Sequence, residues 1–400
     1  MRVGLVAVGD ELLDGRVADT STSWLAGRLV EAGLTVAGAW LVGDDVDRIA
    51  GALAEAATVA DVVVVLGGLG PTSDDVTREG IARWARLPLT DQPDRQAEQP
   101  AGGQVVPNPV GTAPGIRLIH EGVEVVALPG VPREMRAMGA LLVAELGGRS
   151  GMPRRASVDL RVVLVAESEV ARVLAPAEDR WRASWPAVTV SYLASPGEVV
   201  LHVSGPRGWT GGPEVVDDVR HRLGASVLEP AGSAPSLAAH VLARLREVGA
   251  SLATAESLTG GLVGAELTSV PGSSDVYRGG VVSYATELKA TLLDVPEALL
   301  AAHGPVHPDV AVAMACGVRH RLGATYGLAT TGVAGPAAQG GRAPGTVYAA
   351  VAGPGRRRVA WLVHPADRAT VRRYAVVLAL DTLRRLAQGE PAVPEREQQE

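Results

Sequence analysis

Residues 255–261 read AESLTGG, and this stretch organises the C-terminal part of the 400-residue chain. The apolar run at 252–255 predicts a short buried strand, because continuous apolar runs are typical of strands covered on both faces. After the stretch, apolar residues recur at helical spacing over 262–267, which predicts a helix. Ser257 therefore stands where a buried strand ends and a helix is about to begin.

The loop between this strand and this helix has the composition of an anion-binding turn. Thr259 is a candidate N-cap, and Gly260 and Gly261 let a ligand approach free amides at the helix start. The loop thus predicts an anionic substrate held beside the Ser257 hydroxyl. A serine at such a junction is also typical of a plain helix cap, so the loop alone leaves both interpretations open.

Further segments accompany this loop along the chain: PGSS (271–274), GGVVSYATELKATLLDVP (279–296), TTGVAGP (330–336) and GTVYAAVA (345–352). Together with AESLTGG they resemble the C-terminal amidase domain of the CinA family, the nicotinamide mononucleotide (NMN) deamidases. The resemblance implies an α/β domain over residues 235–390. It further implies hydrolysis of NMN to nicotinate mononucleotide and ammonia, with no cofactor required for that step.

The same resemblance assigns catalytic roles to four residues. Ser257 is the expected nucleophile and Lys289 its base, since a Ser–Lys pair is a known variant of the catalytic triad. A lysine with a pKa of about 10.4 is protonated at neutral pH, so this role requires burial or a cationic neighbour. Tyr284 is expected to bridge the pair through its hydroxyl, and Thr331 to contact the substrate or the oxyanion.

Residues around these four are expected to bind the substrate: Glu256, Thr259, Gly260, Gly261, Gly332, Arg368 and Arg372. The two arginines are four residues apart in a helical pattern, so they share a face and are candidates to grip a phosphate. Solvated helix charges are the alternative for them. Lys289 on a solvated helix face and Tyr284 in the core are the corresponding alternatives for the catalytic residues.

Composition limits the class of protein. At 400 residues the chain is long enough for two or three domains, and 47% hydrophobic with 20% charged residues is typical of a globular protein. A net charge of −7 gives no general reason to bind nucleic acid or anionic membranes. The single cysteine, Cys316, fits a reducing compartment, and no apolar stretch is long enough to span a bilayer. We therefore expect a cytoplasmic protein.

The first 150 residues alternate apolar runs with helical patterns. The runs at 3–8, 34–42 and 62–66 predict strands, and the segments between them predict helices, which together indicate a parallel sheet. Ligands of such sheets bind at the carboxyl ends of the strands. The loops 9–15 and 67–75 should therefore face one crevice.

Glycines, a threonine and carboxylates in these loops predict a nucleotide site in which backbone amides hold phosphate. The candidates are Gly9, Asp10, Glu11, Asp19, Gly67, Gly68, Gly70, Thr72, Asp74, Asn108 and Thr112. Asp10, Asp74 and Asp75 are candidates to bind a divalent metal such as Mg²⁺. Tight turns and helix caps are the alternative explanation for the same residues.

Four segments of this domain resemble the molybdopterin-binding-like domain that opens CinA proteins: 9–29, 67–82, 108–115 and 128–135. In some family members that domain hydrolyses ADP-ribose with a divalent metal. Here the chain is short after Leu89, where the family usually has an additional helix that borders the crevice. Ser21 also stands where an asparagine is usual. The resemblance therefore implies the fold more strongly than the pyrophosphatase activity.

Residues 155–230 predict a small α+β domain with the order strand, helix, two strands, helix, strand (226–228), resembling the KH-like middle domain of CinA proteins. Its GPRG loop at 205–208 follows a strand, whereas a GxxG loop that clamps nucleic acid joins two helices. We therefore expect a spacer or dimerisation element and no nucleic-acid partner.

The sequence thus predicts a multidomain α/β protein with three parts: a parallel-sheet molybdopterin-binding-like domain (1–150), a small α+β KH-like domain (155–230) and an α/β amidase domain (235–390). We expect an NMN deamidase that forms a homodimer and has no membrane partner. The alternatives are an ADP-ribose pyrophosphatase and a nucleotide-binding scaffold without turnover. His303, His307 and Cys316 fit no compact zinc signature, so we expect core packing there.

Overall fold

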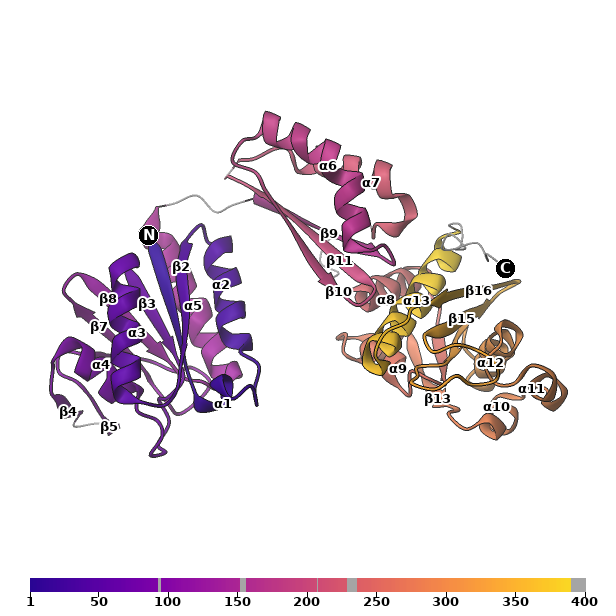
Figure 1. Ribbon diagram of the computed structural model, residues 1–400, viewed down its shortest axis with the longest axis horizontal. Helices are drawn as coiled ribbons and strands as arrows, with labels where there is room; N and C mark the ends of the chain where they lie inside the picture. Colours follow the sequence, from indigo (N-terminus) through magenta and orange to yellow (C-terminus); the bar gives the residue numbers. More distant parts are fainter. Residues whose placement is uncertain (93–94, 152–155, 207, 229–235, 390–400) are drawn as a thin grey trace. The chain divides into compact units, whose positions relative to one another are not determined.

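The computed structural model describes residues 1–92, 95–151, 156–206, 208–228 and 236–389. The chain divides into two compact units, Met1–Ala156 with Gly205–Trp209, and Ser157–Ser204 with Thr210–Glu400. Each unit is α/β in character, as predicted (Figure 1). Among the described residues, no helix has the length and apolarity needed to span a membrane.

The N-terminal unit is built on a six-stranded sheet of order β2-β1-β3-β8-β7-β6. The first four strands are parallel, which confirms the predicted parallel sheet, and the last two pairings are antiparallel. In this order the strands are β2 (Thr35–Val42), β1 (Arg2–Val8), β3 (Val62–Leu66), β8 (Val123–Leu128), β7 (Gly115–His120) and β6 (Gln104–Val106). A separate hairpin joins β4 (Leu89–Gln92) to β5 (Arg95–Pro100).

Helices cover both faces of this sheet (Figure 1). Helices α2 (Thr20–Glu31) and α5 (Pro132–Ser150) pack on one face, and α3 (Val46–Val59) and α4 (Thr77–Ala85) pack on the other. Residues of β3 are buried on both sides, which explains why its sequence is continuously apolar. The short helix α1 (Asp10–Leu13) lies in the loop after β1.

The second unit begins with a three-stranded sheet of order β10-β11-β9. Its elements are β9 (Ala156–Val163), α6 (Glu167–Ser184), β10 (Thr189–Ser195), β11 (Glu198–Gly205) and α7 (Gly212–Leu223). The prediction of a last strand at 226–228 is wrong, because only Val227 forms a single bridge there, with Val162. A 3-10 turn, Gly224–Ser226, takes up the chain that a strand would need. Arg207 of the GPRG loop lies outside the described residues.

The rest of the second unit is organised around a five-stranded sheet of order β13-β12-β14-β15-β16. The first three strands are parallel and the last two pairings antiparallel. The strands are β13 (Tyr277–Val282), β12 (Leu252–Glu256), β14 (Tyr326–Gly332), β15 (Thr346–Gly353) and β16 (Arg356–Val363). The strand predicted before Ser257 is therefore confirmed and lies inside the sheet, next to β14.

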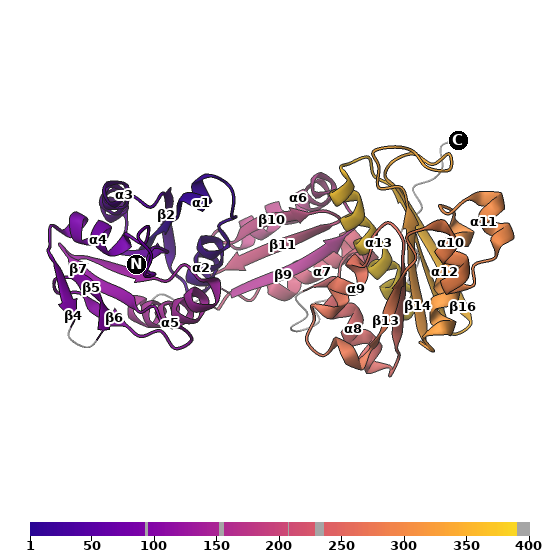
Figure 2. The same ribbon diagram turned by 90° about the horizontal axis from the view of Figure 1, so that it is seen from below.

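This sheet also lies between two layers of helices (Figure 2). Helices α8 (Leu237–Glu247), α9 (Leu262–Thr268) and α13 (Arg368–Gln388) pack on one face. Helices α10 (Thr286–Leu293), α11 (Glu297–His303) and α12 (Pro308–Arg321) lie on the other face. The loop after β12 and the helix α10 thus approach the carboxyl end of the sheet from different layers.

Two glycines let α12 pack closely enough to fix the position of α10. A Cβ atom on Gly317 of α12 would lie 1.8 Å from the carbonyl oxygen of Leu293, at the end of α10. A Cβ atom on Gly327 of β14 would lie 2.0 Å from the carbonyl oxygen of Ala315 in α12. Because backbone atoms occupy both places, any larger residue would force these elements apart.

The three-stranded sheet is attached to the five-stranded part through α13. Gly197, at the turn between β10 and β11 with φ of 84°, approaches so closely that a Cβ atom would lie 3.1 Å from Val377. Arg384 donates to the carbonyl oxygen of Ala225 at 2.6 Å, and the buried carboxylate of Asp381 holds the Arg384 guanidinium at 2.7 Å. The same carboxylate binds Arg385 at 2.7 Å, so one buried acid orients two buried arginines.

We expect Gly317→Ala to destabilise the second unit by about 1–3 kcal/mol, because the added methyl must displace the Leu293 carbonyl. Differential scanning calorimetry of the full chain measures this as a lower transition temperature for that unit. Gly51→Ala in α3 is the control, since nothing lies within 4 Å of its Cβ position and alanine favours helices. A Gly317→Ala protein as stable as the wild type would contradict the close packing of α10 and α12.

Candidate functional site

Ser257 directly follows β12, where the main chain leaves the sheet. Its amide still donates to the carbonyl oxygen of Thr330 on β14 at 3.0 Å, which extends the strand pairing by one residue. The Gly260 amide then donates to the Ser257 carbonyl at 3.0 Å and closes a tight turn. Gly260 and Gly261 have φ of 59° and 97°, which side-chain-bearing residues rarely adopt. The glycines therefore serve the turn that presents the serine.

The carboxylate of Glu256 caps the helix that follows. It accepts hydrogen bonds from the amides of Gly261 at 2.9 Å, Val263 at 3.0 Å and Gly264 at 2.8 Å. The Gly260 amide is occupied by the Ser257 carbonyl and the Gly261 amide by Glu256. The prediction that these two amides are free to bind an anion is therefore wrong. Glu256 is buried and faces these amides, which leaves no carboxylate oxygen for the predicted substrate contact. A buried acid already supplies the negative charge that this helix start favours.

Thr259 is not the N-cap, because Gly261 occupies that position. The Thr259 hydroxyl is buried and bonds the hydroxyl of Thr330 at 2.7 Å, which ties the loop to β14. Arg372 of α13 donates to the carbonyl oxygens of Leu258 at 3.0 Å and Thr259 at 2.7 Å. These bonds show Arg372 holding the serine loop, where the sequence predicted a phosphate ligand.

Lys289 reaches the serine from α10 on the opposite layer. Its amine lies 3.2 Å from the hydroxyl oxygen of Ser257 and donates to the carbonyl oxygen of Ser283 at 2.7 Å. The side chain has no exposed surface. Burial, partly opposed by the carboxylate of Glu287, lowers the pKa of the Lys289 amine to about 8. The depressed pKa that a lysine base requires is thus a property of this position.

The serine and lysine border a small cavity of about 120 Å³. Five segments that are distant in the sequence form its wall, namely the serine loop, α10 with the residues before it, the residues before α12, the end of β14 with the loop after it, and the start of α13. The lining residues are Ser257, Leu258, Tyr284, Lys289, Pro305, Val306, Gly332, Val333, Ala334, Gly335, Ala337, Gln339 and Arg368. Gly332 and Arg368 therefore lie where the sequence predicted, whereas Gly260 and Gly261 are not part of the wall.

Tyr284 does not bridge the serine and the lysine. More than half of its surface is exposed, at 58%, and its hydroxyl accepts a hydrogen bond from Arg368 at 2.7 Å. Arg368 also donates to the carbonyl oxygen of Gly335 at 2.9 Å. The two side chains thus join the start of α13, the segment before α10 and the loop after β14. They line the cavity, and their hydrogen bonds to each other and to Gly335 stabilise its wall.

Thr331 is buried and does not line the cavity. Its hydroxyl donates to the carbonyl oxygen of Pro305 at 2.7 Å, and Pro305 and Val306 form part of the wall. Thr331 therefore holds a residue of the cavity wall in place and does not make the predicted direct contact with the substrate. Sequence reasoning missed Pro305, Val306 and Gln339 as lining residues, because no pattern in the sequence links these loops to the serine.

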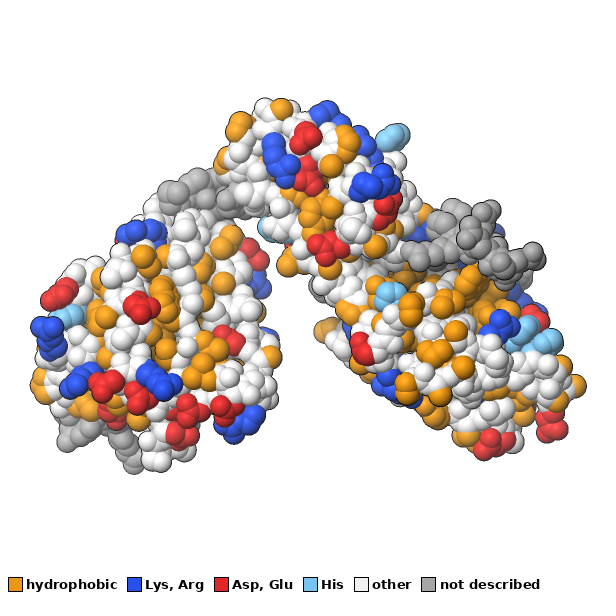
Figure 3. Space-filling view, viewed as in Figure 1, with side chains coloured by type: hydrophobic (Ala, Val, Ile, Leu, Met, Phe, Trp, Pro, Cys, Tyr) orange, Lys and Arg blue, Asp and Glu red, His pale blue; other side chains and the backbone are white. Residues whose placement is uncertain are grey.

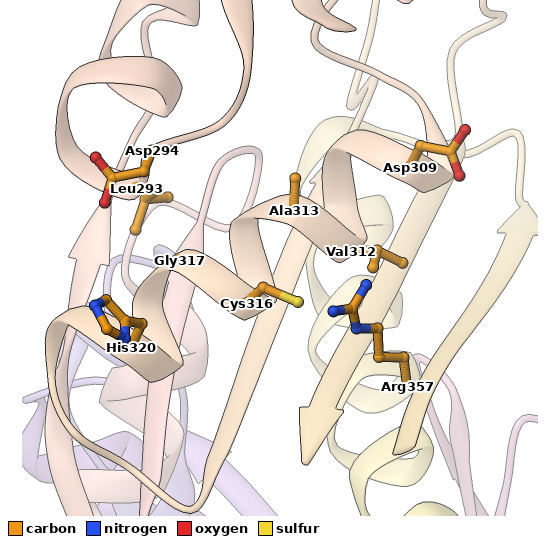
Figure 4. A pocket seen from close by; sticks show the side chains of 9 residues that line it. All are labelled: Leu293, Asp294, Asp309, Val312, Ala313, Cys316, Gly317, His320 and Arg357. Atoms are coloured by element: carbon orange, nitrogen blue, oxygen red, sulfur yellow. The ribbon is translucent and has the colours of Figure 1, made fainter. Parts of the chain in front are cut away.

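A second hollow of about 500 Å³ lies along α12 (Figure 4). Cys316 is half-buried against the core and its sulfur also borders this hollow, together with His320 and Arg357. His303 and His307 stack on each other elsewhere, with ring centroids 4.2 Å apart. Within the described residues, no group of three His, Cys, Asp or Glu side chains is arranged to hold a metal ion.

In the N-terminal unit, the loops 9–15 and 67–75 both follow the carboxyl ends of parallel strands, as predicted. Acidic side chains, with arginines among them, gather over the end of this unit that carries α1 (Figure 3). The Asp10 amide donates to Asp44 at 2.8 Å, and the Asp44 amide donates to Asp10 at 3.2 Å. Burial and the nearby charges of Asp10, Glu11 and Asp74 raise the pKa of the Asp44 carboxyl, which sequence reasoning missed.

Several predicted nucleotide ligands in this unit instead bind the protein. Asp75 accepts hydrogen bonds from the Thr72 amide, at 2.9 Å, and from the Thr72 hydroxyl. Although burial alone would raise it, the bonds from Thr72 and the Gly70 amide lower the pKa of Asp75. Asp75 is thus engaged by Thr72, and among the described residues Asp10, Asp74 and Asp75 are not grouped to hold a metal ion.

The glycines of the second loop are required by its shape. Cβ atoms on Gly67 and Gly68, whose φ values are 107° and 64°, would lie 2.5 Å from the Val8 carbonyl and 2.2 Å from the Thr77 hydroxyl. A Cβ atom on Gly70 would lie 2.4 Å from Asp75. These contacts favour the tight-turn interpretation for all three glycines.

The remaining candidates of this unit divide between caps and exposed positions. Asp19 caps α2 through the amides of residues 21 and 22, at 3.0 and 2.9 Å. Asn108 donates to the carbonyl oxygen of Ala113 at 2.8 Å and to Glu134 at 2.6 Å. Glu11 and Thr112 are exposed, and Gly9 precedes α1 as its N-cap residue.

Comparisons with known proteins agree with both units. Residues 234–387 match the family model of the CinA C-terminal domain, and residues 4–147 match that of the "Probable molybdopterin binding domain". A CinA-like protein of Frankia casuarinae is 44% identical, over 98% of this chain and 97% of its own. A CinA-like protein of Myxococcus xanthus is 38% identical, over 98% and 100%.

Among solved structures, the protein CinA from Thermoplasma acidophilum, whose function is described as unknown, is 35% identical. The similarity covers 36% of this chain and 97% of that one, with a TM-score of 0.35. The full-length relatives and the two family models show the family of this chain. The chain belongs to the CinA family.

Proposed function

We propose that the C-terminal domain hydrolyses the carboxamide of NMN, giving nicotinate mononucleotide and ammonia. The observation that carries this proposal is the 3.2 Å contact between the Ser257 hydroxyl and the fully buried amine of Lys289. A hydroxyl beside an amine of lowered pKa is the arrangement required of a nucleophile and its base. The resemblance to nicotinamide mononucleotide deamidases supplies the substrate.

In the first half of the reaction, neutral Lys289 accepts the proton of Ser257 as the serine oxygen attacks the carbon of the carboxamide. The C=O double bond opens to a tetrahedral oxyanion. When this intermediate collapses, the C–N bond breaks and the Lys289 ammonium returns its proton to the leaving nitrogen. Ammonia departs, and an ester between Ser257 and the nicotinoyl group remains.

In the second half, water attacks the ester and gives its proton to Lys289. Collapse of the second intermediate breaks the ester, releases the acid and returns the proton to the Ser257 oxygen. The amide of Leu258 is a suitable donor to the oxyanion in both halves, because it directly follows the nucleophile. Within the described residues this amide has no hydrogen-bond acceptor, and Leu258 lines the cavity. The protons pass through Lys289 throughout, so the scheme names no cofactor.

We expect purified protein to release ammonia from NMN in the presence of EDTA. Ser257→Ala and Lys289→Ala should each reduce the rate by about a thousandfold or more, because removing either partner leaves the hydroxyl unactivated. A coupled assay for ammonia measures these rates. Arg356→Ala is the control, since this arginine is exposed, lies outside the cavity and should not change the rate.

Two outcomes would contradict the proposal and indicate different alternatives. If NMN is not turned over while ADP-ribose is cleaved after Mg²⁺ or Mn²⁺ is added, the N-terminal unit is the enzyme. If neither substrate is turned over, the alternative of a nucleotide-binding scaffold without turnover remains. Ammonia release that survives Ser257→Ala would show that the serine is not the nucleophile.

We expect kcat/KM for NMN to increase with pH and to level off above an apparent pKa of about 8. The sign follows from the role of Lys289, because only the unprotonated amine can accept the serine proton. Below this pKa, each decrease of one pH unit should lower kcat/KM about tenfold. A profile that stays flat between about pH 6 and 9 would exclude an amine of this pKa as the base.

A further inference from the structure

The phosphate of a mononucleotide needs a cation, and the predicted arginine pair is largely occupied. Arg372 donates to the carbonyl oxygens of Leu258 and Thr259 and does not line the cavity. Arg368 lines the cavity but donates to the Gly335 carbonyl and the Tyr284 hydroxyl. The two arginines therefore form no phosphate-binding fork, and the structure offers a different cation for this purpose.

Arg342 is a half-buried arginine whose guanidinium has no hydrogen bond or ion pair with any residue that the structure describes. It lies over the ring of Tyr348, with 5.9 Å between the guanidinium carbon and the ring centroid. An aromatic ring holds a guanidinium in place without using its N–H donors. The donors of Arg342 therefore remain available to a ligand.

A tight turn places Arg342 beside the cavity. Gln339 and Arg342 exchange backbone hydrogen bonds of 3.1 and 3.0 Å around two glycines, Gly340 and Gly341, with φ of 56° and 74°. Positive φ at both central residues is the pattern of a two-residue hairpin turn, which fixes the residues at its ends. Gln339 lines the cavity. Arg342 thus stands across a closed turn from a residue of the cavity wall.

Two further observations place Arg342 near the cavity wall. Tyr348 pairs in register with Thr331, whose hydroxyl holds the wall residue Pro305. His307, two residues after Pro305, has a pKa lowered by burial, by His303 and by the positive charge of Arg342. The carboxylate of Asp309 opposes this effect and lies 3.6 Å from His307. Arg342 is therefore close enough to the wall for its charge to affect the pKa of His307.

We propose that Arg342 binds the phosphate of the mononucleotide substrate, an inference that rests on the proposed deamidation of NMN. The cavity of about 120 Å³ is smaller than the roughly 300–1,000 Å³ typical of pockets that enclose a whole ligand of this size. The carboxamide ring enters toward Ser257 and Lys289, while the ribose and phosphate extend over the rim. There the guanidinium of Arg342 binds two phosphate oxygens.

The test compares NMN with nicotinamide riboside, which has the same carboxamide and ribose but no phosphate. For Arg342→Ala we expect KM for NMN to increase about tenfold or more, with kcat within about twofold of the wild type. The riboside should be turned over by the variant as by the wild type. The KM of Arg342→Lys for NMN should lie between those of the wild type and Arg342→Ala, because lysine keeps the charge but loses the bidentate contact. Arg356→Ala should change neither substrate's constants.

The inference is wrong if Arg342→Ala leaves KM for NMN unchanged, or if it weakens NMN and the riboside equally. Calorimetric titration of both compounds into Ser257→Ala protein, with and without Arg342→Ala, provides a readout without turnover. Binding that loses its preference for NMN when Arg342 is removed supports the inference, even if the wild type shows no deamidation and the proposed function fails. Binding that keeps this preference, or no binding of either compound, overturns it.

Discussion

The burial of one amine is the constraint on which the C-terminal domain depends. Lys289 has no exposed surface, and its Nζ atom lies between the Ser257 hydroxyl and the Ser283 carbonyl. An isolated buried charge is costly, so burial favours the neutral amine and lowers its pKa. The lowered pKa that the proposed base requires is thus created by the packing of α10 against the sheet.

The two members of the Ser–Lys pair come from opposite layers, and backbone contacts fix both. On one side, Glu256 caps α9 and Arg372 binds the carbonyls of the serine loop. On the other side, Gly317 lets α12 contact the end of α10 at Leu293. Contacts of this kind are typical of preorganised sites, whose groups are already in place before the substrate binds.

Much of the fold could be predicted, because apolar periodicity follows directly from burial. The strands before Gly9 and Ser257 and the alternation of the first domain lie where the sequence indicated. The strand predicted at 226–228 was wrong, since Ser226 ends a 3-10 turn and only Val227 pairs, in a single bridge. The prediction of Thr259 as the N-cap was wrong, because the carboxylate of Glu256, five residues before Gly261, accepts the hydrogen bonds of the amides at that helix start.

The sequence by itself determined the candidate residues for the proposed chemistry, because Ser257 at a strand end and Lys289 on an apolar helix are readable from local patterns and family motifs. Only the tertiary structure decided which donors remain free. Arg372 and Leu258 are 114 residues apart, and Arg368 and Tyr284 are 84 apart, yet these pairs are hydrogen-bonded. A local pattern cannot show such partners, because packing brings them together after the chain has folded. For the same reason, Arg342 emerged as an available cation only in the folded protein.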